Sequence, residues 1–229
     1  MPGYITHNIF GEQEYKKFNN SLVKEAVNEN RTVFNLGLQG PDIFFYFPAY
    51  FLINKKNLGS IMHTRKTCEY ICKMLEFVQN LDEKEDKKIA LAYLSGFLGH
   101  YSLDRTCHPY IYWKTDRMHK TNDHHAKHVA LETDIDFILC KDVLKKNISE
   151  FPYGDKVKMD RQQLDIIARM LSYSLGNTFK YIRFGYEISY AAVANFRLVI
   201  NQLKDKKGKK AKVIRKAETI VIGHEHFTT

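Results

Sequence analysis

The sequence lacks any uninterrupted apolar run that approaches the ~18 residues of a membrane-spanning helix. Its N-terminal residues also lack a basic stretch followed by an apolar segment of signal-peptide length. We therefore expect a soluble protein that acts in the cytoplasm, or outside the cell if a leader has been removed.

Cysteine is scarce too, with four residues in a chain of 229. Three of them lie in stretches typical of helix interiors, so we predict no disulfide framework. Cys68 and Cys72 are four residues apart and would share a helix face, but a soft-metal site would need two further thiols beside them. We therefore interpret both as small buried residues.

Acidic side chains are outnumbered, because 35 lysines and arginines face 26 aspartates and glutamates, for a net charge of +9. This excess favours anionic partners such as phosphate esters, nucleic acid or an anionic membrane surface, without choosing among them. Much of it lies in residues 204–212, which we interpret as a basic linker. We therefore expect a helical domain over residues 1–203 and a basic linker and C-terminal tail over residues 204–229.

Apolar residues are plentiful, at 44% of the chain, which is enough for one packed core. They recur every three or four positions and predict helices over residues 12–28, 59–81, 87–105, 121–145, 160–181 and 185–203. Residues 37–48, which contain a Gly-Pro pair, are predicted to form a loop. The third helix should end just before Pro109, because a residue that precedes proline is disfavoured in the α region. Only residues 212–222 have the alternation of a strand.

The most informative segment ends the third predicted helix. Residues four apart in an α-helix differ by roughly 40° around the axis, so His100 and Asp104 project from one face. His108 lies just past the same edge. His128 and Glu132 repeat this spacing in the next predicted helix. Two helices would thus each present histidine and carboxylate side chains on one face.

Imidazole nitrogen and carboxylate oxygen suit zinc, which takes about four such ligands at roughly 2.0–2.2 Å. A single such pair is more often a surface ion pair, but His100 ends an apolar run, where a polar cluster is costly to bury unless paired or metal-bound. Helical bundles build metal sites from inward-facing pairs of this kind. The predicted fold is therefore all-α, a multi-helix bundle with a metal cluster in its core.

Isolated residues extend this pattern along more than half of the chain. The ordered set comprises His7, Gly40-Pro41-Asp42, His63, His100-x-x-x-Asp104, His108 and His128-x-x-x-Glu132. It resembles the zinc-dependent phospholipase C family, which shares its fold with single-strand-specific zinc nucleases. Each short motif is weak alone, but the order of the whole set agrees with that of the family.

The resemblance implies ligands for two or three zinc ions. Those of the first ion would be Asp42, His63, His100 and Asp104, and those of the second His108, His128 and Glu132. A third ion would be held by His7 and a shared Asp104, together with the N-terminal amino group of the chain. Asp42 would also be the catalytic residue that orients or deprotonates the attacking water.

The function that the resemblance implies is hydrolysis of a phosphoric ester, in which a metal-activated water attacks a phosphodiester. Zinc can lower the pKa of water to near 7 and neutralise phosphate oxygens. The basic excess would attract a phospholipid or nucleic-acid substrate and would favour peripheral contact with an anionic membrane.

Two alternatives to this function stay open. One is a single-strand nuclease of the same fold, and the other is a non-catalytic basic module that binds nucleic acid or anionic lipid. The pattern assigns neither an oligomeric state nor a role to His224 and His226. Asp136, four residues after Glu132, is either a surface carboxylate or a residue that holds a ligand imidazole.

Overall fold

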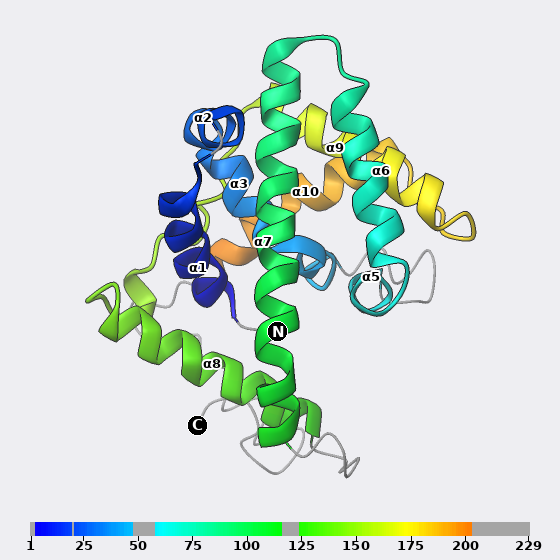
Figure 1. Ribbon diagram of the computed structural model, residues 1–229. Coiled ribbons are helices and arrows are strands. Elements are labelled where there is room, and N and C mark those ends of the chain that lie inside the picture. The colour runs from blue at the N-terminus through cyan, green and yellow to red at the C-terminus, as the bar shows by residue number, and fades with distance from the viewer. Residues whose placement is uncertain (1–2, 20, 48–57, 116–123, 203–229) are drawn as a thin grey trace. The chain divides into compact units, whose positions relative to one another are not determined.

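The computed structural model describes residues 3–19, 21–47, 58–115 and 124–202. Every regular element in these ranges is a helix, which confirms the predicted all-α class (Figure 1). None of the helices described is long and apolar enough to cross a membrane. The chain divides into two compact units: unit 1 comprises residues 1–7, 102–151 and 202–229, and unit 2 comprises residues 8–101 and 152–201.

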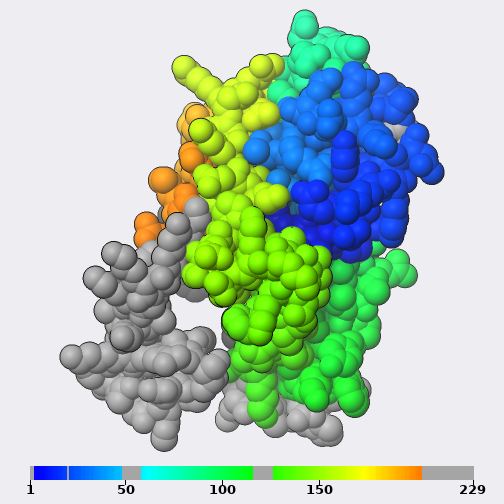
Figure 2. Space-filling model, turned by 90° about the vertical axis from the view of Figure 1, so that its left-hand side faces the viewer, coloured from blue at the N-terminus to red at the C-terminus, as the bar shows by residue number. Residues whose placement is uncertain are grey.

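Unit 2 holds most of the helices. They are α1 (Tyr4–Lys17) after its first turn, α2 (Ser21–Glu29), α3 (Arg31–Gly37), the 3-10 helix η1 (Gly40–Phe44), α5 (Leu58–Thr64), α6 (Thr67–Gln79), α7 (Lys84–Lys114) as far as Tyr101, α9 (Arg161–Thr178) and α10 (Tyr186–Asn201). Helix α9 packs against both α6 and α10, while α5 and α10 pack against η1. In the space-filling view α2 and α3 form one continuous blue surface (Figure 2).

Two glycines allow α3 and α7 to approach closely in unit 2. A Cβ atom added to Gly37 would lie 2.3 Å from the carbonyl oxygen of Tyr93, and one added to Gly96 would lie 2.2 Å from that of Phe34. Any side chain at either position would therefore push the two backbones apart. This contact holds the segment that follows α3 against α7, one turn before His100.

Unit 1 contains the second part of α7 from Ser102, together with α8 (His124–Asp142), the 3-10 helix η3 (Ile148–Glu150) and the first turn of α1. Helix α8 packs against η3. The ring of Tyr4 meets that of Phe151 edge to face, with centroids 6.0 Å apart. The N-terminal turn of α1 is thus part of the packing of unit 1.

Several predicted helix boundaries are wrong. The helix predicted over residues 12–28 is interrupted, because α1 ends at Lys17 and α2 begins at Ser21; Asn19, between them, favours turns over helix interiors. The helix predicted over residues 59–81 breaks at Lys66, which adopts the left-handed conformation with φ of 55° and donates a hydrogen bond to the carbonyl of Thr178. A tertiary contact thus fixes a break that local spacing does not reveal.

Pro109 does not end α7, which continues to Lys114. Both Arg105 and Pro109 lie on the exposed side of the helix, where water can satisfy the carbonyl group that proline leaves without its amide partner. His108 therefore stays in helical register with Asp104. Residues 37–48 are likewise more regular than a loop, because η1 begins at Gly40 with Pro41 in its first turn, a position that suits proline.

The last two predicted helices are confirmed within a few residues as α9 and α10. Asp160 caps α9, where its carboxylate accepts a hydrogen bond from the amide of Gln163 at 2.8 Å. Cys68 and Cys72 are exposed, so the prediction that both are buried is wrong; they lie on the outer side of α6. The predicted strand over residues 212–222 and the tail over 204–229 lie outside the described residues.

Candidate metal centre

Two imidazoles in unit 2 point their Nε2 atoms at each other. The Nδ1 atom of His63 lies 2.7 Å from the carbonyl oxygen of Gly59, and the Nδ1 atom of His100 lies 3.1 Å from that of Leu38. A carbonyl oxygen only accepts, so both Nδ1 atoms carry the hydrogen in the neutral rings and both Nε2 atoms present a lone pair. These two Nε2 atoms are 3.3 Å apart. Two lone pairs at this distance repel each other unless a cation lies between them.

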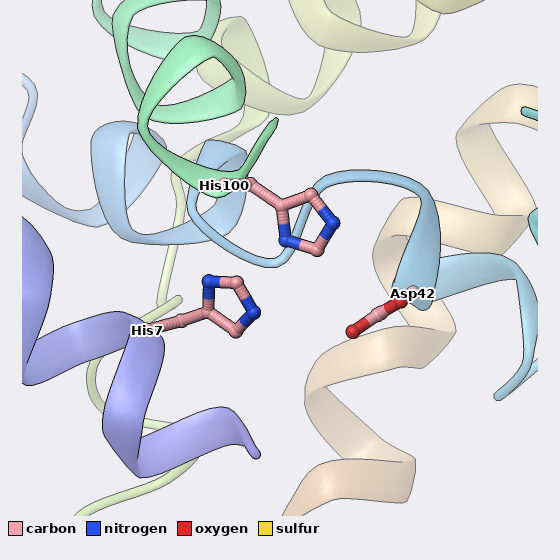
Figure 3. A group of neighbouring side chains, drawn as sticks. All are labelled: His7, Asp42 and His100. Atoms are coloured by element: carbon pink, nitrogen blue, oxygen red, sulfur yellow. The ribbon is translucent and has the colours of Figure 1, made fainter. Parts of the chain in front are cut away.

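Asp42 on η1 brings a carboxylate to the same place. Its Oδ1 atom lies 3.4 Å from the Nε2 atom of His63. The His100 ring and the Asp42 carboxylate point into the same space (Figure 3). Ligand atoms at 2.0–2.1 Å from a tetrahedral zinc ion are roughly 3.3–3.4 Å apart. The distances from the His63 Nε2 atom to His100 and to Asp42 therefore both match the edge of a zinc site.

Glycine shapes the pocket around the two imidazoles. Gly40 has φ of 49°, and a Cβ atom added there would lie 2.4 Å from the Cδ2 atom of His100. At Gly59 an added Cβ atom would lie 2.9 Å from the ring of Phe45, which stacks on His63 with centroids 5.9 Å apart. Both glycines therefore leave room for rings that orient the candidate ligands.

A second pair of donors lies in unit 1. His7 on α1 is fully buried and Asp104 on α7 is almost so, and the His7 Nε2 atom lies 3.3 Å from the Asp104 Oδ1 atom. This separation also equals the edge of a tetrahedral zinc site. Asp104 follows His100 by one turn of the continuous helix α7, as the spacing of four residues predicts.

The position of His7 depends on a buried carboxylate of α8. Asp136 accepts hydrogen bonds from the amide of Ile5 at 3.0 Å, and from the amide and hydroxyl of Thr6 at 2.7 and 2.6 Å. Gly3 permits this contact, because a Cβ atom there would lie 2.3 Å from the carboxylate. Burial raises the pKa of Asp136, while the hydrogen bonds from Thr6 and Ile5 lower it in part. Asp136 is thus not a surface carboxylate, and the contacts it makes anchor the turn before His7.

The third group of donors also lies in unit 1. Ligand atoms of His108, His128 and Glu132 all lie within 4.8 Å of one another, and all three side chains are half-buried. Tyr112 stacks on His108 with centroids 4.8 Å apart and an interplanar angle of 5°. The His128 Nε2 and Glu132 Oε1 atoms are 2.7 Å apart, a hydrogen-bond distance shorter than the edge of a zinc site. These two atoms must separate slightly if both are to bind one ion.

The donor chemistry of these groups fits zinc. Every donor is an imidazole nitrogen or a carboxylate oxygen, held in a buried or half-buried place. The Cys107 thiol does not compete for zinc as a thiolate, because burial and the nearby Asp104 carboxylate both raise its pKa. All eight predicted residues thus belong to one of three local groups within the units. His224 and His226 lie outside the described residues.

Several groups that orient the donors are not marked by any residue type in the sequence. The carbonyls of Leu38 and Gly59 are backbone groups, so no residue type marks them. Tyr112 stands four residues after His108, a spacing at which side chains of one helix meet, and this was the one available sign of its stacking. Gly40 was visible in the Gly-Pro-Asp motif, but its contact with His100 depends on the packing of η1 against α7.

Residues 6–182 of the chain match the family model described as "Zinc dependent phospholipase C". The match covers well over half of the 229 residues and includes all eight candidate ligands. No curated protein and no solved structure matches the chain. The family match agrees with the resemblance found in the ordered histidine and carboxylate motifs.

Proposed function

The chain belongs to the zinc-dependent phospholipase C family, and from this premise we propose that it hydrolyses a phosphodiester with the help of two or three zinc ions. The observation that carries the proposal is the 3.3 Å separation of the Nε2 atoms of His63 and His100. Both rings are fixed by backbone carbonyls in tautomers that cannot hydrogen-bond to each other. His63 and His100 would together hold a divalent cation through both lone pairs, which would remove the repulsion.

The proposed ligands are those that the family resemblance implies. They are His7, Asp42, His63, His100, Asp104, His108, His128 and Glu132. The family resemblance implies that Asp104 would be shared between two ions, and within unit 1 its carboxylate lies beside His7. When bound, the ions would acidify a water molecule and neutralise the negative charge that builds on the phosphate oxygens.

Asp42 is the proposed catalytic residue. Its carboxylate approaches the Nε2 atom of His63 at 3.4 Å and has 13% of its side chain exposed, so one edge of the group remains open to water. A carboxylate in this position accepts a hydrogen bond from the attacking water and can take up its proton. The buried surroundings of His100 keep bulk water away from the other side of the group.

The proposed substrate is a phospholipid phosphodiester. The family description names a phospholipase, and the net charge of +9 attracts an anionic phosphate group. Zinc ligands alone do not separate a phospholipase from a nuclease, because both cleave phosphodiesters. A substrate panel therefore has to compare a phosphatidylcholine, single-stranded DNA and a simple phosphomonoester.

Elemental analysis and turnover test the proposal together. The purified chain should hold at least one tightly bound zinc ion, and His100→Ala should lose both zinc and turnover of a chromogenic phosphodiester. Met170→Ala is the matched control, because Met170 is equally buried in unit 2 on α9 but lies in the apolar core. It should lose stability while it keeps its zinc.

Three results would overturn the proposal. They are less than one zinc ion per chain, unaltered activity in His100→Ala, and turnover that persists in a chelator. Preference for single-stranded DNA within the panel would establish the nuclease instead. Binding of DNA or lipid that weakens with salt, survives chelation and brings no turnover would establish a non-catalytic basic module.

A further inference from the structure

Two exposed thiols share one side of helix α6 in unit 2. Cys68 and Cys72 are four residues apart on this helix, and both are exposed. Each stands two residues from Tyr70, which is about 200° around the helix axis, so both lie opposite the buried face that Tyr70, Met74 and Val78 form. A ligand can therefore reach both thiols without any change in the core of unit 2.

The helical spacing of this pair opposes a disulfide bond. Side chains four residues apart on an α-helix have Cβ atoms about 5–6 Å apart, whereas the Cβ atoms of a disulfide are about 3.5–4.5 Å apart. Closing the bond would unwind a turn of α6, and the packing of α6 against α9 opposes such unwinding. The helix therefore keeps both thiols available as ligands.

A two-coordinate soft cation fits the same spacing. A bond from thiolate sulfur to a first-row metal is about 2.3 Å long, so a linear sulfur–metal–sulfur unit spans about 4.6 Å. The two Sγ atoms can reach this separation by rotation about χ1, because exposed side chains are free to change rotamer. Thiolate is a soft ligand and selects Cu(I) over harder cations. The pair therefore matches a cation of the Cu(I) class.

The charges of α6 also favour such a complex. Two thiolates and one monovalent cation carry one net negative charge, and Cys68 is the second residue of α6, in the turn where the helix dipole stabilises negative charge. The two acidic residues of α6 are ion-paired with lysines: Glu69 lies 2.9 Å from Lys66, and Glu76 lies 2.7 Å from Lys73. Their compensated carboxylates therefore repel the complex only weakly.

Zinc fits the pair less well than a soft monovalent cation does. Zinc takes about four ligands, and Cys68 and Cys72 are the only two cysteines of unit 2. The donors of the candidate metal centre are imidazoles and carboxylates instead. Ligand softness and ligand number should therefore direct zinc to that centre and a soft cation to the thiol pair.

We propose that Cys68 and Cys72 form a binding site for a soft monovalent cation of the Cu(I) class. Binding forms two metal–sulfur bonds and releases the two thiol protons to water, without any change in oxidation state. The inference goes beyond the proposed hydrolase and does not rest on it, because no donor of the candidate metal centre takes part.

Competition for Cu(I) with bicinchoninate, without oxygen, tests the site in the purified full chain. The unmodified protein should bind one Cu(I) ion. Cys68→Ser and Cys72→Ser should each weaken binding by on the order of 100-fold or more, because the second thiol acts at high effective concentration. Zinc content and Tm should not change, since both side chains are exposed. Unaltered Cu(I) affinity in both variants, or loss of zinc together with Cu(I), would overturn the proposal.

A displaced thiol provides the matched control. The double variant Cys68→Ser with Gln79→Cys keeps the number of exposed thiols, because Gln79 is exposed at the end of the same helix. Its two thiols are seven residues apart, about 10.5 Å along the axis, which is too far for one ion to bridge. This variant should bind Cu(I) as weakly as Cys68→Ser. Affinity equal to that of the unmodified protein would mean that the exposed thiols bind Cu(I) separately, and the chelating pair would be refuted.

Phenylarsine oxide and one further variant separate the thiol pair from the rest of the chain. Arsenic(III) exchanges its oxygen for two thiolates and releases one water, so mass spectrometry should find one adduct per unmodified chain and none on Cys72→Ser. Equal adduct on both proteins would assign the reaction to the other cysteines and count against the pair. His100→Ala should keep its Cu(I) affinity; if it does not, the ion binds at the candidate metal centre and the proposed thiol site fails.

Discussion

The Nε2 atoms of His63 and His100 lie 3.3 Å apart, although neither ring can donate a hydrogen bond to the other in its fixed tautomer. If a zinc ion relieves this repulsion, loss of one ring should release the ion. We expect His63→Ala to lose about one zinc ion per chain and to weaken residual binding by more than the ~10–100-fold that loss of an outer partner costs. Elemental analysis and a competition titration with a chromogenic chelator would measure both.

The neighbouring Thr64 provides the control for this variant. It is exposed, and its hydroxyl bonds only to the carbonyls of Ser60 and Ile61 in its own helix. Thr64→Ala should keep the zinc content of the unmodified protein. Equal zinc content in His63→Ala and Thr64→Ala would remove His63 from the ligand set.

Gly40 should be intolerant of a side chain. Alanine there would adopt a positive φ, at a cost of about 1–2 kcal/mol, and its Cβ atom would strike the His100 ring at 2.4 Å. Gly40→Ala should therefore lower both the free energy of unfolding and the zinc affinity. Gly176→Ala is the control, because an added Cβ atom meets nothing within 4 Å in α9 and should stabilise the helix by about 0.5–1 kcal/mol. Chemical denaturation should show a lower free energy of unfolding for Gly40→Ala and a higher one for Gly176→Ala. A gain of stability in both variants would contradict the steric role of Gly40.

The sequence predicted the helical class and paired His100 with Asp104 and His128 with Glu132, because local periodicity carries both; the grouping of the other candidate ligands came from the family resemblance. Asp104 and His128 stand four residues from partners on their own helices, so α-helical geometry alone brings each pair to one face. The breaks at Asn19 and Lys66 were missed, since the second depends on a hydrogen bond to Thr178, more than a hundred residues away. Long-range contacts of this kind have no local signal.

The contrast between local spacing and long-range contacts also applies to the groups that orient the donors. The carbonyl of Gly59 lies one turn before His63 in α5, so this partner is local. The carbonyl of Leu38 becomes a partner of His100 only after the segment that follows α3 packs against α7 in unit 2, and the spacing of the histidines does not reveal it. Continuation of α7 through Pro109 was likewise hidden, since it depends on that side of the helix facing water. Burial, which no short motif encodes, decides both.

Lys88 should make part of the stability of unit 2 dependent on pH. Its ammonium lies 2.7 Å from Glu25 and 2.8 Å from Glu29, and the hydrogen bond from Lys88 holds the pKa of Glu25 below its usual value of 4.5. A lowered folded-state pKa means that this stabilisation is present above pH 4.5 and is lost as the pH falls through the folded-state pKa. Lys88→Met should thus lower Tm most near neutral pH.

Thermal unfolding at several pH values would measure this effect. The difference in Tm between the unmodified protein and Lys88→Met should shrink as the pH drops below 4.5, while Lys24→Met, on the exposed side of α2, should show little difference at any pH. A difference that stays constant into the acid range would mean that Lys88 acts through packing of its side chain rather than through charge.

Asp136 should control the zinc affinity of the site that contains His7 without being a ligand. Its carboxylate holds the amides of Ile5 and Thr6, the two residues that directly precede His7. Asp136→Ala leaves buried donors without an acceptor, so we expect a loss of about 2–4 kcal/mol in the free energy of unfolding. Asp136→Asn keeps one acceptor oxygen and should lose less.

A purely structural role for Asp136 would lower stability alone, so zinc affinity is the decisive measurement. In Asp136→Ala the unanchored turn should misplace His7 relative to Asp104, and one zinc ion should bind more weakly by about 10–100-fold, as for other groups that orient ligands. Asp134→Ala, exposed on the same helix, should change neither property. Met170→Ala should match the stability loss with unchanged zinc affinity, because its side chain lies in the core of unit 2. If Asp136→Ala and Met170→Ala bind zinc equally well, the anchoring of α1 has no bearing on the metal centre.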